Sequence, residues 1–165
     1  MKKILYFACL LTAVLTSCSK DDIESTATVD MAGQWYVRAD VIYDGEVYTD
    51  LYGYGQFLLL TYNTADNTPD EMWVTDNGNF WTFKVKAPIN QKTLTFATNG
   101  VVENQISGYG IGVKITNGKI LPKAGLQKNG APADSITLDV EFEDDEDGYI
   151  YRFQGVRYSG LKEND

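Results

Sequence analysis

The stretch Ile136-Thr137-Leu138-Asp139-Val140-Glu141-Phe142 decides the fold. Its apolar residues occupy every second position, and the three polar residues alternate with them, so the two kinds of side chain would lie on opposite faces of an extended chain. This alternation predicts a β-strand with one face in a hydrophobic core and the other in water.

Neighbouring segments carry related patterns. Phe80 to Ala87 alternates with Trp81, Phe83, Val85 and Ala87 on the inner side, and Gln34 to Ile42 alternates more loosely. Phe57 to Leu60 is apolar on both faces and predicts a central strand. Asp-Gly and Asn-Gly pairs separate the segments and are typical of tight antiparallel hairpins. The strand windows between turns are 32–43, 52–63, 71–76, 79–87, 92–98, 101–106, 110–121 and 134–158, and the last two are long enough for more than one strand each.

The fold class predicted from these windows is all-β and antiparallel, with about eight to ten strands. That number of short strands fits either a small closed barrel or a two-sheet sandwich. Closure into a barrel would leave no unpaired strand edge.

The N-terminus predicts export and lipidation. Lys2 and Lys3 precede an apolar run that ends in Leu15-Thr16-Ser17-Cys18, the pattern of a lipoprotein signal peptide. The run is too short for a membrane-spanning helix. We therefore expect residues 1–17 to be removed, Cys18 to carry the lipid, residues 18–30 to form a flexible tether, and residues 31–165 to form a single β-barrel domain.

The tether also predicts a location. Lys20-Asp21-Asp22 directly follow Cys18-Ser19, and this acidic pattern resembles an export signal for surface lipoproteins. We expect an outer membrane lipoprotein of a Gram-negative bacterium that faces the cell surface. Its expected partners are the membrane, through the lipid anchor, and neighbouring surface lipoproteins.

Composition excludes several functions. Removal of Lys2 and Lys3 would take the net charge from −9 to −11, which disfavours nucleic acid as a partner. The chain has no histidine, and both cysteines lie at or before position 18, so a Ser-His-Asp triad, a Cys-His pair and a His-based zinc site are all excluded. We predict no cofactor, no metal site and no catalytic residue.

A family resemblance covers nearly all of the mature chain. Gly33-Gln34-Trp35 is similar to the Gly-x-Trp that opens the first strand of lipocalin-like barrels, and Arg152 or Arg157 could stack on Trp35. The longer matching runs are 59–65, 72–74, 76–86, 115–120, 132–136 and 157–160. Together they resemble the family of lipid-binding putative hydrolases. The resemblance implies a lipocalin-like (calycin-like) barrel, a location at the outer membrane and an apolar ligand. The family's name also mentions a hydrolase, but the resemblance supplies no nucleophile or acid–base pair to carry over to this chain.

Aromatic residues are the candidate ligand contacts. Tyr62, Trp73, Trp81 and Phe83 are the predicted pocket-lining residues, because large aromatics are common in pockets for lipids and sugars. Packing inside the barrel is the alternative for each. Trp35, Arg152 and Arg157 are the candidate structural residues.

Two polar segments are further candidates. The connection 63–71 could close over a barrel mouth. The acidic run 141–148 suggests calcium, but its consecutive carboxylates favour a charged hairpin tip over a calcium loop.

Three functions follow as alternatives. The favoured one is a lipid-anchored binding protein that holds a small apolar or amphipathic ligand. The second is a surface glycan-binding or accessory protein of an outer-membrane uptake system, whose tryptophans would face solvent. A carboxylate-dependent hydrolase is the least favoured, because no pair of acidic residues can be singled out as catalytic.

Overall fold

The structure is a computed structural model that describes residues 25–161. The predicted signal peptide and Cys18 lie outside the described residues. The ten strands are β1 (Gly33–Tyr43), β2 (Glu46–Tyr48), β3 (Gln56–Asn63), β4 (Glu71–Thr75), β5 (Lys84–Asn90), β6 (Thr95–Phe96), β7 (Val102–Glu103), β8 (Gly112–Leu126), β9 (Pro132–Phe142) and β10 (Ile150–Arg157). No helix in residues 25–161 has the length and apolarity to cross a bilayer.

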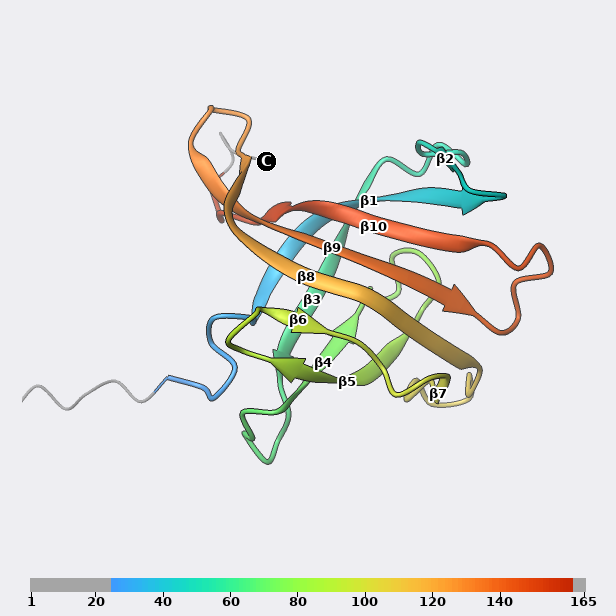
Figure 1. The fold of residues 1–165 in the computed structure, drawn as a ribbon, viewed down its shortest axis with the longest axis horizontal. Coiled ribbons are helices and arrows are strands. Elements are labelled where there is room, and N and C mark those ends of the chain that lie inside the picture. The colour runs from blue at the N-terminus through green and yellow to red at the C-terminus, as the bar shows by residue number, and fades with distance from the viewer. Residues whose placement is uncertain (1–24, 162–165) are drawn as a thin grey trace, which may run out of the picture.

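Eight of these strands close into an antiparallel barrel (Figure 1). The order around the sheet is β10-β9-β8-β6-β5-β4-β3-β1, and β1 pairs with β10 to complete the circle. The closing pair is long, running from Trp35 opposite Arg157 to Ile42 opposite Ile150. β2 extends β1 as a hairpin, and β7 pairs with β8. The predicted all-β fold with eight to ten strands is confirmed, and the barrel replaces the sandwich alternative.

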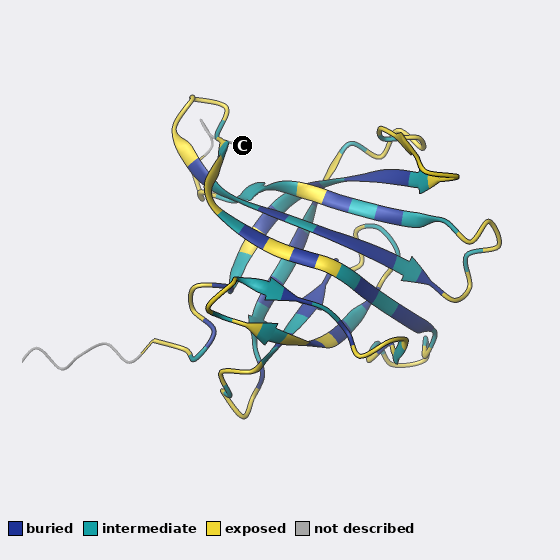
Figure 2. Cartoon of the chain, viewed as in Figure 1, coloured by how far each residue is buried: buried dark blue, intermediate teal, exposed yellow. Residues whose placement is uncertain are grey.

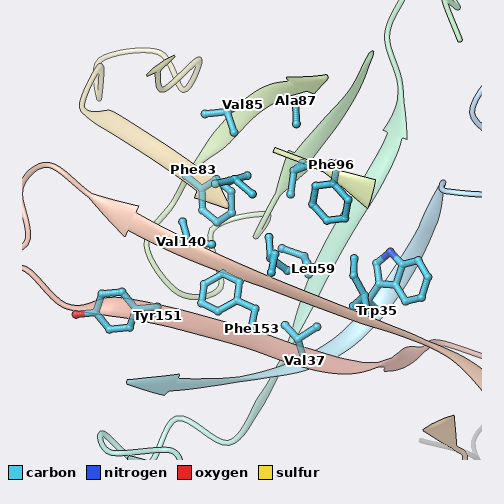
Figure 3. Close-up of a cluster of buried hydrophobic side chains, with 14 of the residues drawn as sticks. Trp35, Val37, Leu59, Phe83, Val85, Ala87, Phe96, Val140, Tyr151 and Phe153 are labelled. Atoms are coloured by element: carbon cyan, nitrogen blue, oxygen red, sulfur yellow. The ribbon is translucent and has the colours of Figure 1, made fainter. Parts of the chain in front are cut away.

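Side chains from the strands fill the barrel interior. On β9, Ile136, Leu138, Val140 and Phe142 all point inward and are buried, as their alternation predicts. Inward side chains of the other barrel strands join them in one hydrophobic cluster, part of which is labelled in Figure 3. Figure 2 shows the same alternation of buried and exposed positions along the strands. Burial of this cluster is the main stabilising contribution to the fold.

One end of the barrel is closed by a chain of hydrogen bonds around Trp35. Its indole Nε1 donates to Thr61 Oγ1 at 2.9 Å, and Thr61 Oγ1 donates to the Met31 carbonyl oxygen at 2.7 Å. Met31 is itself fully buried beneath the barrel. The segment before β1 therefore plugs this end.

Arg157 covers Trp35 from the outside. Its guanidinium carbon lies 4.4 Å from the indole centroid, and its Nη1 donates to the Ala32 carbonyl oxygen at 2.6 Å. Gly33 leaves the space that this guanidinium occupies, since a Cβ there would lie 2.6 Å from Nη1. Of the two arginines considered for this place, Arg157 takes it.

The strand predicted over 79–87 is wrong in its first half. β5 begins at Lys84, and residues 79–83 form part of a loop. The predicted windows 92–98 and 101–106 shrink to the two-residue strands β6 and β7. The loop at 79–83 has a definite cause in the side chain of Asp76, which also organises the candidate site.

Candidate functional site

The two ends of the barrel differ in the segments that form them. The N-terminal end comprises residues 25–32, the chain end at 158–161 and the connections 64–70, 91–94 and 127–131. The far end comprises the connections 44–55, 76–83, 104–111 and 143–149. In Figure 1 the N-terminal segment lies at the left, while the connections after β1 and β9 lie at the right. The candidate site is at the far end.

Asp76 organises the loop that covers the far end. This fully buried carboxylate accepts five backbone N–H groups, from Gly78 (3.1 Å), Phe80 (2.9 Å), Trp81 (2.6 Å), Thr82 (2.8 Å) and Phe83 (2.9 Å). The loop wraps around the carboxylate because N–H bonds to a charged acceptor are stronger than those to a neutral one. They offset the cost of Thr82, a β-branched residue held at a φ of 60°.

This loop places Phe80 and Trp81 over the end of the core. The Phe80 ring stacks on Phe57 at a centroid distance of 5.2 Å, and the Trp81 indole stacks on Phe142 at 4.7 Å. Both rings also contact Tyr151, at 5.3 Å each. The inner faces of Phe80 and Trp81 therefore close the core, which leaves their outer sides to form a surface.

That surface is a hollow of about 510 Å³ lined by Tyr54, Phe80, Trp81, Thr82 and Tyr109. Tyr54 is 59% exposed and packs edge-on against Phe80 at 5.1 Å. We call this the aromatic hollow. Its walls come from three separate connections of the chain, and four of its five residues are aromatic.

Asp144 joins the two rings on one side of the aromatic hollow. Its Oδ1 accepts the Trp81 Nε1–H at 2.9 Å, and its Oδ2 accepts the Tyr109 hydroxyl. Burial and the Asp144 carboxylate together raise the pKa of Tyr109 to about 12. The phenol therefore stays protonated at neutral pH. The negative charge at the edge of the aromatic hollow is that of the Asp144 carboxylate.

The aromatic hollow continues into an exposed rim. Six large hydrophobic side chains between residues 43 and 54 are 44% to 59% exposed, namely Tyr43, Val47, Tyr48, Leu51, Tyr52 and Tyr54. Edge-on ring pairs connect parts of the rim, with Tyr52 and Tyr54 6.4 Å apart and Tyr43 and Tyr149 5.3 Å apart. Several large exposed hydrophobic side chains in one connection are typical of interaction sites.

The predicted pocket residues are distributed over three places. Trp81 lines the aromatic hollow, whereas Phe83 is fully buried in the core. Tyr62 and Trp73 form a cross-strand pair whose side chains are half-buried on the outer surface of β3 and β4. Lys84 Nζ lies 4.5 Å from the Trp73 ring centroid and Lys86 Nζ lies 5.4 Å from it. Ligand contact by these four residues stays a prediction.

The third structural candidate, Arg152, belongs to an ion-pair network on the outer face of β1, β9 and β10. It donates through Nε and Nη2 to Asp139 at 2.8 and 3.0 Å, and Arg38 binds Asp40 in the same two-pronged way. Burial opposes ionisation of both aspartates. Nevertheless Arg38 holds the pKa of Asp40 below its usual value, and Arg152 does the same for Asp139. Both carboxylates are thus held ionised by their partners, which suits a structural role.

The acidic run after β9 is used by the protein itself. Glu143 accepts the Gly112 N–H at 2.8 Å, and Asp145 accepts the Tyr149 N–H at 2.9 Å. Among residues 25–161, no group of three or more acidic, His or Cys side chains is placed to hold a metal ion. These hydrogen bonds order the loop and position Asp144 beside the aromatic hollow.

A larger surface hollow of about 610 Å³ lies where the short β6 joins β5 to β8. Its lining includes the polar residues Asn90, Thr98, Asn99, Asn117 and Lys119 around Phe96 and Ile89. Only one of its residues is aromatic, so it offers less to an apolar ligand than the aromatic hollow does.

Sequence reasoning missed Tyr54, Phe80, Tyr109 and Asp76 as site residues. Tyr54 and Tyr109 lie in connections far apart in the sequence, and only barrel closure brings them together. The Asp76-Asn77-Gly78 turn carried one usable signal, because Asp is favoured where its side chain can accept nearby backbone N–H groups.

The fold and the site define a closed eight-stranded antiparallel barrel with an amphipathic aromatic hollow at one end. The family model described as lipid-binding putative hydrolase matches residues 20–162, and the chain belongs to that family. A search of curated proteins finds no match to this chain.

Proposed function

We propose that the protein is a lipid-anchored protein of the cell envelope that binds a small apolar or amphipathic ligand in the aromatic hollow. Membership of a lipid-binding family supports the class of ligand. The observation that carries the proposal is the aromatic hollow itself, in which four aromatic side chains and one carboxylate meet at the end of the barrel. Few polar groups around an apolar surface are typical of small-molecule sites.

The ligand sits at the far end because the barrel interior is occupied. Leu59, Phe83 and Phe153 are fully buried and lie in the centre of the cluster in Figure 3. A ligand in the lumen would have to displace such packed side chains, and emptying a core position costs several kcal/mol. Binding against Phe80 and Trp81 leaves the core intact.

The lipid anchor and the aromatic hollow lie at opposite ends of the molecule in this proposal. Cys18 precedes Ser25, the first described residue, by seven positions, and seven extended residues span at most about 25 Å. The described chain enters at the N-terminal end of the barrel (Figure 1). A lipid on Cys18 would therefore hold that end near the membrane and turn the aromatic hollow outward.

The test is a titration of the purified protein with 1-monodecanoylglycerol, a neutral single-chain amphiphile. We expect saturable binding, read by calorimetry, that Tyr54→Ala weakens at least about tenfold because it removes one wall of the hollow. Tyr158→Ala is the control, since Tyr158 is a tyrosine at the N-terminal end of the barrel and lines neither the hollow nor the rim.

Equal affinity of the two variants would contradict the assignment of the site. Absence of binding by the wild-type protein would contradict the function. Saturable binding of a free sugar such as maltose, with no binding of the amphiphile, would favour the glycan-binding alternative.

A further inference from the structure

The connections that surround the aromatic hollow carry charged residues of one sign only. The four connections of the far end contain nine of the 23 acidic residues of the chain and none of its 14 basic residues. The two lysines that border these connections point elsewhere: Lys84 lies over Trp73, and Lys114 pairs with Glu141 at 2.7 Å. A negative potential at this end attracts cations and repels carboxylate or phosphate groups.

The walls of the aromatic hollow suit a particular kind of cation. Tyr54, Phe80, Trp81 and Tyr109 present four aromatic side chains to one space, and the ring faces of such residues carry negative charge density. Trp81 and Tyr109 both donate hydrogen bonds to the Asp144 carboxylate, which polarises the two rings further.

The polar groups at the hollow favour a cation without N–H donors. Both oxygens of Asp144 already accept a hydrogen bond from a ring donor. A primary ammonium would need further acceptors to replace its lost hydration, whereas a quaternary ammonium needs none and binds through its methyl groups to aromatic rings.

We propose that the aromatic hollow recognises a trimethylammonium headgroup. This inference rests on the proposed function, because it names the polar end of the amphiphile that the hollow would take. The headgroup sits among the rings of Tyr54, Trp81 and Tyr109, with the Asp144 carboxylate beside it, and the rest of the ligand extends over the exposed rim.

The experiment compares choline with 3,3-dimethylbutan-1-ol, which has the same shape but carries no charge. We expect choline to bind with a dissociation constant of about 0.1–10 mM and at least about tenfold more tightly than the neutral compound. The measurement follows the indole N–H signal of Trp81 by NMR. Choline binding should also weaken as sodium chloride is raised, because salt screens the surrounding carboxylates.

Three variants locate the effect. Tyr54→Ala should weaken choline binding at least about fivefold, and Tyr158→Ala, at the opposite end of the barrel, should leave it unchanged. Asp144→Asn should reduce the preference for choline over the neutral compound, since it removes the charge and keeps an acceptor oxygen. Circular dichroism of each variant shows that the barrel is intact.

Equal affinity for choline and its neutral counterpart would overturn the inference, as would no choline binding up to about 100 mM. If 1-monodecanoylglycerol binds and choline does not, the proposed function stands and the headgroup assignment is wrong. If neither binds, both are wrong.

Discussion

At the scale of single residues, Asp76 is the main residue that holds the candidate site in place. Its carboxylate accepts five backbone N–H groups and so fixes the loop that carries Phe80 and Trp81. The sequence around it alternates as a strand would, but a buried carboxylate that satisfies five donors outweighs the pairing that the pattern predicts. The Asp76 side chain thus holds residues 79–83 as a loop that covers one end of the barrel, where the pattern predicts a strand.

Asp76→Ala should destabilise the protein by about 3 kcal/mol, because it leaves five buried or part-buried N–H groups without an acceptor. Urea unfolding measures the change. Asp66→Ala, in the exposed connection 64–70, is the control and should stay within about 0.5 kcal/mol of wild type. A loss below about 1 kcal/mol for Asp76→Ala would show that the loop is held by its aromatic contacts instead.

At the scale of strands, the contact between β1 and β10 closes the barrel. Gly155 lies opposite Val37 in this pair, and a Cβ at Gly155 would overlap the backbone carbonyl of Tyr36. The neighbouring backbone cannot move aside as a flexible side chain could. Closure therefore depends on the absence of a side chain at this position.

Gly155→Ala should cost about 3 kcal/mol of stability, since the two closing strands must separate to admit the methyl group. Thermal and urea unfolding would measure it. Gly110→Ala is the control: its Cβ would meet only the side chain of Glu103, at 3.0 Å, which is exposed and free to rotate. Equal stability of the two variants would mean that β1 and β10 are not tightly paired.

The ion pairs across β1, β10 and β9 predict a pH dependence. The pKa values of Asp40 and Asp139 are lowered in the folded state by Arg38 and Arg152. Their contribution is therefore fully present above the unfolded-state pKa of about 4 and is lost as pH falls through the folded-state values. The stability advantage of wild type over the double variant Asp40→Asn, Asp139→Asn should shrink between pH 4 and pH 2, measured by urea unfolding. A constant difference over that range would contradict this account.

The sequence predicts features that depend on neighbouring residues better than features that depend on contacts between distant segments. Alternation in residues 136–142 predicts a strand correctly, because inward and outward positions follow directly from the period of two. The strand predicted over 79–87 fails at Phe80 to Phe83, because their N–H groups donate to the side chain of Asp76 instead of to a partner strand. The aromatic hollow could not be predicted, since Tyr54, Trp81 and Tyr109 meet only after the barrel closes.

At the scale of the whole molecule, the two ends of the barrel differ in structure and in proposed role. The N-terminal end is plugged by Met31 and covered by Arg157, and the far end carries the aromatic hollow and its carboxylates. The sequence before residue 25 would attach the first end to a membrane. The proposed function requires this arrangement, because a ligand could then reach the hollow from outside.

Lipidation of Cys18 can be tested with azido-palmitate labelling in cells. Wild type and Cys9→Ala should both take up the label, and Cys18→Ala should not, because Cys9 lies within the predicted signal peptide. A labelled Cys18→Ala variant would contradict the predicted anchor. One acyl chain holds a protein only marginally at a membrane, so the lipid on Cys18 is expected to carry more than one chain.

The most direct measurement of the central claim is an NMR titration that follows the indole N–H signals of Trp35 and Trp81 while 1-monodecanoylglycerol is added. Trp35 lies fully buried at the N-terminal end of the barrel, and Trp81 lines the hollow at the far end. Binding in the aromatic hollow predicts that the Trp81 signal shifts to saturation while the Trp35 signal stays in place. A shift of Trp35 with no shift of Trp81, or no shift of either, would contradict it.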